Sequence, residues 1–370
     1  CRPDIEAAYG DKLRPMDAFK DSAPAELVDC VGHDDLMVLM FTSGTTGRSK
    51  AVMLSERNFF TTVECQVKFG DAMLDYKHEH MPEDKNDVLS NFAILPLFHL
   101  GTFICLFVWA CKGWALNLSA DIRDFYRDLS LMHSDVMASA PMLVETIYND
   151  MKRGRVSRLN GLWDLCCSSA ALDPRMLLEL AQNGFVVNQC YGMTETFGDG
   201  ILNFTQVEKH MSAVGKPDDH VQYKLDETGE ICIKGDCVML GYYKDPEATA
   251  EVIDADGWFH TGDLARVDED GFYYITGRKK NIIILDNGEN VSPEELENLL
   301  SKCEAVKECI VREKGKKICA VIYCGEADQQ TVRDFITETN RTLPLYKRMS
   351  AVEFSTEPLP RTGTGKLLRK

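Results

Sequence analysis

The sequence predicts an α/β protein with a large domain and a smaller one attached. Its 370 residues exceed what a single compact core usually holds. Between residues 36 and 189, short apolar runs alternate with stretches of helical periodicity, which is typical of parallel sheets flanked by helices. From residue 221 onwards, short runs separated by tight turns indicate an antiparallel β subdomain, and the C-terminal part has the pattern of a small α+β domain.

The large domain is predicted to contain short buried strands and helices in alternation. The strands span residues 36–42, 88–95, 135–138 and 186–189, and the helices span residues 55–69, 121–131, 141–152 and 174–182. Such alternation predicts a parallel sheet with helices on both faces. Turn signals rich in Asp and Gly, at 226–230, 254–257 and 268–271, mark the antiparallel subdomain.

The charge balance predicts a domain boundary between residues 278 and 279. Residues 279–370 carry 16 basic and 14 acidic residues, a net charge of +2. Residues 1–278 carry the other 25 basic and 44 acidic residues, a net charge of −19. The expected domains are therefore 1–278, large and lacking an N-terminal portion, and 279–370, small.

The small domain has clear element signals. Ser292 suits the N-cap of a helix, with Pro293 at the first helical position and Glu295 completing a capping box. Strands at 309–313 and 318–324 flank a hairpin turn at 314–316, and a helix over 331–340 and a strand at 352–354 follow.

Composition excludes several classes of protein. A net charge of −17 disfavours bulk nucleic acid or an anionic membrane as a partner. The longest apolar run, 100–111, is shorter than the roughly 20 residues of a membrane span, so we expect it to be core and expect no transmembrane segment. The 14 cysteines include no CxxC pair and no signal peptide is visible, which predicts reduced thiols in a cytoplasmic protein. A first residue other than Met suggests a missing N-terminal portion, and the sequence gives no oligomeric state.

A glycine- and hydroxyl-rich turn follows the first predicted strand. Backbone N–H groups and hydroxyls in such a turn can converge on phosphate oxygens, and Lys50 and Arg48 add positive charge. The order of residues is not that of the P-loop of NTPases, and a plain connecting turn is the alternative. The candidate phosphate-binding residues are Thr42, Ser43, Gly44, Thr45, Thr46, Gly47 and Lys50.

A second candidate segment, 191–195, follows the strand predicted at 186–189. It therefore lies at the carboxyl end of a parallel strand, where open α/β sheets bind ligands. Tyr191 can stack on a purine, with Gly192 beside it, Thr194 can reach a phosphate, and Glu195 can hold Mg²⁺. The alternative is a structural turn in which Glu195 caps a helix.

Three further segments suit nucleotide chemistry. Small residues such as Ser169, Ala170 and Ala171 permit close approach of a flat ring, although a tight packing turn would use them too. A carboxylate such as Asp263 can accept two hydrogen bonds from a vicinal diol, but with Arg278 it also makes an ordinary ion pair. Lys366, in a tail rich in Gly, can swing in to neutralise charge at a phosphate; a basic disordered tail is the alternative.

Taken together and in this order, the segments resemble the adenylate-forming superfamily, which includes acyl-CoA synthetases, luciferases and the adenylation domains of peptide synthetases. The resemblance runs from about residue 35 to residue 366 and is carried by TSGTTGRSK, YGMTE, TGDL, GRKKN, GENV and PRTGTGK. It is closest to long-chain fatty acyl-CoA synthetases. Ser49 departs from the usual proline, and serines stand where the family has glycines at the start of the 168–171 segment.

The resemblance implies a role for each candidate. Segment 169–171 and Tyr191 would contact adenine, Asp263 and Arg278 the ribose, Thr194 the α-phosphate, and Glu195 the magnesium ion. Lys366 would catalyse adenylation, and Lys280 would be the hinge about which the small domain turns. His99, by itself more often a core histidine, would line the acyl pocket. The loop of Gly288, Glu289 and Asn290 would enter the site for the thiol step.

The expected function is that of an ATP-dependent acid–thiol ligase. It would adenylate a small-molecule carboxylic acid, a medium- or long-chain fatty acid by resemblance, and pass the acyl group to coenzyme A, with ATP and Mg²⁺ as cofactors. Two alternatives stay open. The acceptor would otherwise be the phosphopantetheine thiol of a carrier protein, or the chain would be a nucleotide-binding fragment without turnover.

Overall fold

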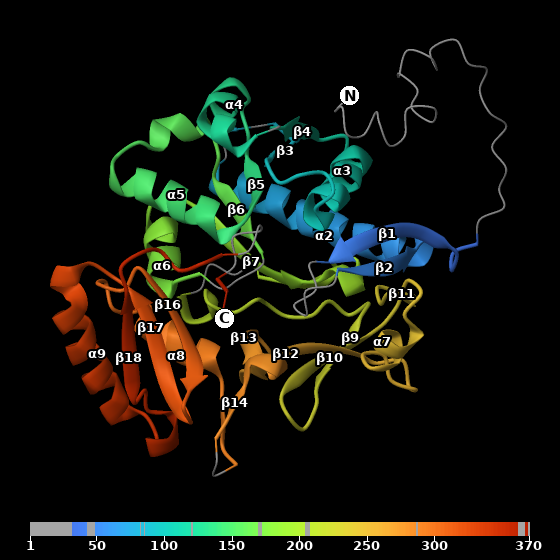
Figure 1. Ribbon diagram of the computed structural model, residues 1–370. Coiled ribbons are helices and arrows are strands. Elements are labelled where there is room, and N and C mark those ends of the chain that lie inside the picture. The colour runs from blue at the N-terminus through green and yellow to red at the C-terminus, as the bar shows by residue number, and fades with distance from the viewer. Residues whose placement is uncertain are drawn as a thin grey trace, which may run out of the picture.

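A computed structural model describes residues 32–42, 49–81, 83–84, 86–119, 121–168, 172–203, 208–285, 288–361 and 367–368. Its centre is a six-stranded sheet with the strand order β4-β3-β5-β6-β7-β8 (Figure 1). The neighbours from β4 to β7 run parallel, and only β8 runs antiparallel. The strands are β3 (Ser90–Ala93), β4 (Ala115–Leu118), β5 (Val136–Ser139), β6 (Asp164–Cys167), β7 (Val186–Gly192) and β8 (Gly200–Leu202).

Helices cover both faces of this sheet, as predicted. Val136 and Val186 pack with α2 and α3 in one apolar cluster, whereas their neighbours Met137 and Val187 pack with α4, α5 and α6 in another. Successive strand residues point to opposite faces, so two cores form on one sheet. The helices are α2 (Glu56–His80), α3 (Leu100–Lys112), α4 (Phe125–Leu131), α5 (Pro141–Lys152) and α6 (Pro174–Gln182), with short 3₁₀ turns η3 (Ile122–Asp124) and η4 (Val156–Leu159).

A strand forms at residues 36–42 as predicted, but the prediction that this strand is buried is wrong. β1 (Leu36–Thr42) pairs antiparallel with β2 (Lys50–Ser55), and β2 pairs with β11 (Gly241–Tyr242), in a separate three-stranded sheet. Phe41 is 73% exposed and Leu39 is 37% exposed. An apolar run indicates strand propensity. Whether the strand is buried depends on which of its faces other elements cover.

The apolar run at 100–111 is likewise only half core. It forms α3, which buries Ile104, Val108 and Trp109 but leaves Leu106 39% exposed. Within the part of the chain that is described, no helix combines the length and apolar character needed to cross a bilayer.

The antiparallel subdomain is confirmed as the sheet β13-β12-β10-β9. Its three predicted turns each place a glycine at φ between 81° and 84°, the left-handed region that glycine tolerates best. In each turn the leading Asp accepts a hydrogen bond from a backbone N–H two residues on. The elements are β9 (Gln222–Leu225), β10 (Glu230–Lys234), α7 (Pro246–Ala250), β12 (Phe259–Val267) and β13 (Tyr273–Arg278).

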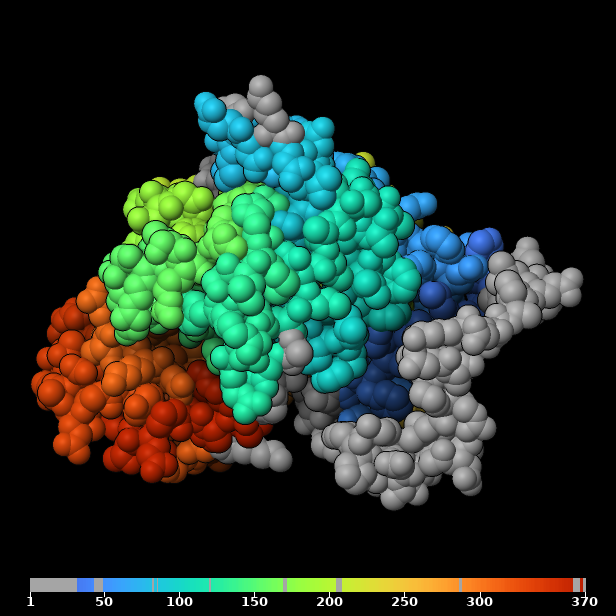
Figure 2. Space-filling view, turned by 90° about the horizontal axis from the view of Figure 1, so that it is seen from above, coloured from blue at the N-terminus to red at the C-terminus, as the bar shows by residue number. Residues whose placement is uncertain are grey.

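The C-terminal residues form a unit with an apolar cluster of their own, drawn from residues 283–354. Figure 2 shows it as the orange and red flank of the molecule, beside the green segments of the large domain. Its elements are η7 (Lys279–Asn281), β14 (Ile283–Ile284), β15 (Asn290–Val291), α8 (Pro293–Leu300), β16 (Glu308–Lys314), β17 (Lys317–Tyr323), η8 (Glu326–Asp328), α9 (Gln329–Thr342), η9 (Leu345–Lys347) and β18 (Ala351–Ser355).

Local signals in this unit are largely confirmed. The β16–β17 hairpin turns at Gly315 and Lys316, both at positive φ, and Ser292 accepts a hydrogen bond from the N–H of Glu295 at 3.4 Å. The Glu295 carboxylate, however, does not close the predicted capping box. It binds Lys347 through both oxygens, at 2.8 and 2.9 Å, because the 3₁₀ turn η9 brings that amine within reach.

Candidate active site

The candidate site begins at the carboxyl end of β7. This strand extends through Tyr191 and Gly192, further than predicted, and leads into η5 (Thr194–Thr196). The chain then returns as β8, so closely that a Cβ at Gly200 would lie 1.8 Å from the Tyr191 carbonyl oxygen. Only glycine fits there, and the tight return fixes the 193–199 loop at the edge where open α/β sheets bind ligands.

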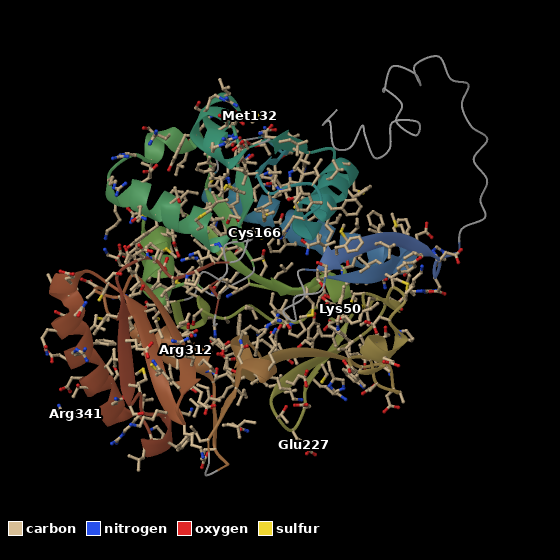
Figure 3. All side chains as sticks on the ribbon, in the orientation of Figure 1. Lys50, Met132, Cys166, Glu227, Arg312 and Arg341 are labelled. Carbon is tan, nitrogen blue, oxygen red and sulfur yellow. The ribbon has the colours of Figure 1, made fainter. Side chains whose placement is uncertain are left out.

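Glu195 is connected to the base of the hydroxyl-rich loop through a tyrosine. The Tyr242 hydroxyl donates to Glu195 Oε1 at 3.0 Å, and the Lys50 ammonium lies 4.3 Å from the centre of the Tyr242 ring. Lys50 itself pairs with Thr42 across β1 and β2. Figure 3 shows Lys50 at the end of the β1–β2 hairpin nearest the middle of the molecule. The ends of the loop therefore meet close to Glu195.

Asp263 is held by two partners from different elements. The Tyr191 hydroxyl donates to Asp263 Oδ2 at 3.0 Å, and the Arg278 guanidinium binds Oδ1 at 2.6 Å and Oδ2 at 3.3 Å. Asp263 and Arg278 face each other across β12 and β13, and Asp263 is only 4% exposed. The structure thus brings the predicted Tyr191, Asp263 and Arg278 into one cluster.

Both tyrosines remain hydrogen-bond donors at neutral pH. Burial first, and then the nearby carboxylate of Asp263, raises the pKa of Tyr191 well above its usual value. Burial followed by the charge of Glu195 raises the pKa of Tyr242 in the same way. Each phenol stays protonated and donates to a charged acceptor, which is the stronger kind of hydrogen bond.

Three residues near the cluster were not predicted from the sequence. Tyr242 is the link to Glu195, and Thr261 receives a hydrogen bond from the Asp263 N–H at 3.1 Å. Glu230 accepts from the Gly262 N–H at 2.7 Å and pairs with Lys279 at 2.7 Å. The threonine and glycine directly precede Asp263 in the sequence, which was the available signal; nothing local marks Tyr242 or Glu230.

Several predicted residues lie outside the described part of the chain: Ser43, Gly44, Thr45, Thr46, Gly47, Ser169, Ala170, Ala171 and Lys366. The segments beside them are described. Leu172, which follows the 169–171 segment, donates its N–H to Gln189 of β7 at 3.2 Å. Arg361 and Leu367, on either side of Lys366, form a bridge, and Arg361 pairs with Glu308 at 2.8 Å.

The remaining predicted residues lie on other elements. His99 is the N-cap of α3, where its Nδ1 accepts from the Gly101 N–H at 3.2 Å. Lys280 lies in η7, directly after the β13 strand that carries Arg278. Gly288 and Glu289 directly precede β15, Asn290 begins it, and the β14–β15 pair lies at the lower edge of the molecule in Figure 1, away from β7.

Comparison with known proteins places this geometry in a family. The family model described as AMP-binding enzyme matches residues 4–243, and the one described as AMP-binding enzyme C-terminal domain matches residues 295–366. A feruloyl-CoA synthase from Amycolatopsis is 32% identical over 98% of this chain and 74% of its own length. A long-chain-fatty-acid–CoA ligase from Salmonella typhimurium is 31% identical over 91% of this chain and 61% of its own length.

Solved structures agree with these relatives. The o-succinylbenzoate coenzyme A synthetase from Bacillus subtilis, in complex with ATP and magnesium ion, has a TM-score of 0.74 and 25% identity over 94% of this chain and 72% of its own. The ATP-bound MatB from Rhodopseudomonas palustris also has a TM-score of 0.74, with 25% identity over 91% and 67% of the two chains. The chain therefore belongs to the AMP-binding enzyme family, among its ATP-dependent acyl-CoA ligases.

Proposed function

We propose that the cluster at the end of β7 binds ATP and a carboxylic acid, joins them as an acyl adenylate, and then serves the transfer of the acyl group to coenzyme A. The convergence of two chains of contacts, Lys50–Tyr242–Glu195 and Tyr191–Asp263–Arg278, supports this proposal most directly. They come from five strands and one 3₁₀ turn, and they meet where α/β sheets hold ligands.

In the first step a carboxylate oxygen of the acid attacks the α-phosphorus of ATP, the bond to the β-phosphate oxygen breaks, and pyrophosphate leaves. Asp263 would accept hydrogen bonds from the ribose hydroxyls, and the flat ring of Tyr191 would lie against adenine. The loop from Thr42 to Gly47 and Lys50 would hold the phosphates, with Thr194 at the α-phosphate. Lys366 would neutralise charge between the two reacting anions.

Glu195 has the chemistry expected of a magnesium ligand. Mg²⁺ prefers carboxylate and phosphate oxygens, and it would screen the charge of the triphosphate during the attack. Among the described residues, Oε1 of Glu195 accepts from Tyr242 and Oε2 has no hydrogen-bond partner. Tyr242 therefore orients the carboxylate while one oxygen can face a cation.

In the second step the thiol sulfur of coenzyme A attacks the acyl carbon and AMP leaves. We propose that residues 279–370 form a small mobile domain that turns about Lys280 between the two steps. The turn would withdraw Lys366 and bring Gly288, Glu289 and Asn290 to the site. Their present position away from β7 is compatible with that motion.

We propose a medium- or long-chain fatty acid as the acid, with His99 at the acyl pocket. The Salmonella relative is named for such a substrate, whereas the Amycolatopsis relative is named for a feruloyl group. Pyrophosphate exchange with ATP, driven by a panel of fatty acids of graded length and of hydroxycinnamic acids, separates the two classes. Exchange with fatty acids alone is the expected result, and exchange with hydroxycinnamic acids alone would overturn the fatty-acid assignment.

A second measurement identifies the acyl acceptor and tests whether the chain catalyses the reaction. Acid that is activated in the exchange assay should appear as a CoA thioester when CoA is added, and not on a phosphopantetheinylated carrier protein. The opposite preference would identify a carrier-loading enzyme. ATP or AMP binding without exchange on any acid of the panel would identify a nucleotide-binding fragment without turnover.

A further inference from the structure

A partly buried cluster of metal-ligating side chains lies beside the candidate site but outside it. Cys65 is on α2, Asp199 follows η5 in the return from Glu195 to β8, and Asp218 and His220 precede β9. One ligand atom each from Cys65, Asp218 and His220 lies within 4.8 Å of the others. Two segments far apart in the sequence thus present a thiol, a carboxylate and an imidazole to one point.

The histidine is oriented by both carboxylates. Its Nε2 lies 2.8 Å from Asp199 Oδ2, and its Nδ1 lies 3.4 Å from Asp218 Oδ1. A carboxylate on one ring nitrogen, with the other nitrogen directed at the ligand point, is the arrangement that supports most metal-bound histidines in proteins. With an ion bound, the carboxylate on Nε2 would hold the tautomer in which Nδ1 can act as a ligand.

Asp199 shows that the protein groups alone do not satisfy this cluster. Its side chain is 1% exposed, and its Oδ1 has no hydrogen-bond partner among the described residues. Burying a carboxylate oxygen without a hydrogen-bond partner is costly. Asp199 also adjoins Cys65, since its charge, after burial, raises the pKa of that thiol. The unpaired oxygen is therefore at the cluster and not remote from it.

An ion-pair network accounts for only part of the arrangement. A protonated His220 between the two carboxylates, with Lys68 at 3.5 Å from Asp218, would neutralise Asp218 and one oxygen of Asp199. It leaves Asp199 Oδ1 without a hydrogen-bond partner among the described residues, and it uses the Cys65 thiol, which is 6% exposed, only as a donor toward Asp199. A cation would instead hold the thiolate, His220 and Asp218 together.

We propose that Cys65, Asp218 and His220 bind a zinc-class divalent metal ion, with Asp199 holding His220 through its Nε2. Thiolate, imidazole and carboxylate are the ligands that Zn²⁺ takes, in tetrahedral sites with ligand atoms about 3.3–3.8 Å apart. The present spread needs a contraction of about 1 Å. Binding would release the thiol proton and tie α2 to the segment that follows Glu195, so the ion would be structural.

The test uses the full chain, purified and passed through a desalting column with a weak chelator. After addition of zinc we expect about one tightly held ion per chain, a raised melting temperature and proton release. Cobalt in place of zinc should show a thiolate-to-metal charge-transfer band in the near ultraviolet. Cys65→Ser should remove that band and weaken binding at least about tenfold, and Asp199→Asn should weaken it about 10- to 100-fold.

Cys303→Ser is the matched control, because Cys303 is also 6% exposed but lies in the small domain. It should keep the ion and the band. Asp218→Asn, at a side chain that is 32% exposed, provides a second ligand variant that should fold even where Cys65→Ser does not. Substoichiometric zinc in the parent chain, or equal binding by the parent and both ligand variants, would overturn the proposal.

Discussion

Asp263 shows how a single residue of the candidate site combines stability with recognition. Its carboxylate accepts from Tyr191 and Arg278 at once, at a side chain that is almost fully buried. With Arg278 alone, Asp263 would form an ordinary structural ion pair. The second partner, a tyrosine from the end of β7, ties it to the edge of the sheet where a nucleotide would lie.

Asp263→Asn should therefore impair nucleotide binding more than folding. The amide keeps the shape of the side chain, but it loses the negative charge that pairs with Arg278. It also loses one of the two oxygens that would accept hydrogen bonds from the ribose hydroxyls. We expect an increase of about tenfold or more in the KM for ATP in pyrophosphate exchange, equivalent to about 1.4 kcal/mol or more. Asp256→Asn, at an exposed turn, is the control. An unchanged KM for ATP would remove Asp263 from the proposed ribose site.

Tyr242 is expected to act through Glu195. Tyr242→Phe removes the hydroxyl that donates to Glu195 but keeps the ring under the Lys50 ammonium. Because the Glu195 carboxylate is then less firmly oriented, the enzyme should need about 3- to 10-fold more Mg²⁺ for half-maximal pyrophosphate exchange. This is the effect of losing about one hydrogen bond. Tyr243→Phe changes the neighbouring tyrosine, which is 44% exposed, and should leave the magnesium dependence unchanged. Equal magnesium curves for both variants would contradict the role.

At the scale of elements, the central sheet contains a buried acid that the proposed chemistry does not use. Asp164 begins β6 at 1% exposure, and burial raises its pKa to about 7. Asn188 on the neighbouring β7 donates to its Oδ2 at 2.8 Å, whereas Oδ1 has no partner among the described residues. Close parallel pairing of β6 and β7 forces the two polar residues into the interior together.

This carboxyl group makes stability depend on pH. The folded chain keeps the Asp164 proton up to a pKa of about 7, whereas the unfolded chain releases it near 3.8. Between these values the folded state binds more protons, so its stability falls as the pH rises and levels off above 7. Asp164→Asn should remove this loss of stability. Its free energy of unfolding should gain on the order of 2–4 kcal/mol relative to that of the parent chain between pH 4 and pH 8.

Urea unfolding of both chains across that range measures the difference. Asp334→Asn, at an exposed position of α9, should show a constant difference from the parent chain at all pH values. A constant difference for Asp164→Asn as well would show that Asp164 is ionised in the folded state at low pH.

At the scale of the whole molecule, the small C-terminal unit meets the rest along α6 and β13, and at β13 Ser292 Oγ donates to the Thr276 carbonyl oxygen at 2.6 Å. Arg175 of α6 donates to the Ser301 carbonyl oxygen at 2.8 Å, and Lys279 at the junction pairs with Glu230 at 2.7 Å. Among the described residues, the C-terminal core draws none from before 283. Separate cores joined by polar contacts permit relative motion, which the proposed two-step chemistry requires.

Lys280→Pro tests the hinge directly. Proline fixes its own φ and restricts the residue before it, so η7 should no longer rotate freely. We expect pyrophosphate exchange to stay within about threefold of the parent, while the single-turnover transfer of the acyl group to CoA slows by about tenfold or more. Lys279→Ala breaks the pair with Glu230 without restricting the backbone, and both rates should persist. Equal slowing of both steps by the proline would locate the hinge elsewhere.

The sequence by itself determined the local parts of this protein. Helices α5 and α6 lie where their helical periodicity predicts, and the β16–β17 hairpin turns within 314–316. These features depend on a few adjacent residues and their backbone preferences. The order of short motifs likewise indicated the family before any contact was known.

Only the tertiary structure decided what each part faces. It decided that β1 is exposed, that Lys50 reaches Glu195 through Tyr242, and that Cys65 meets His220. These contacts join residues that are up to 192 positions apart, as from Lys50 to Tyr242. Such contacts arise when sheets and helices pack, because the free energy that selects them comes from the burial of whole faces rather than from local propensity.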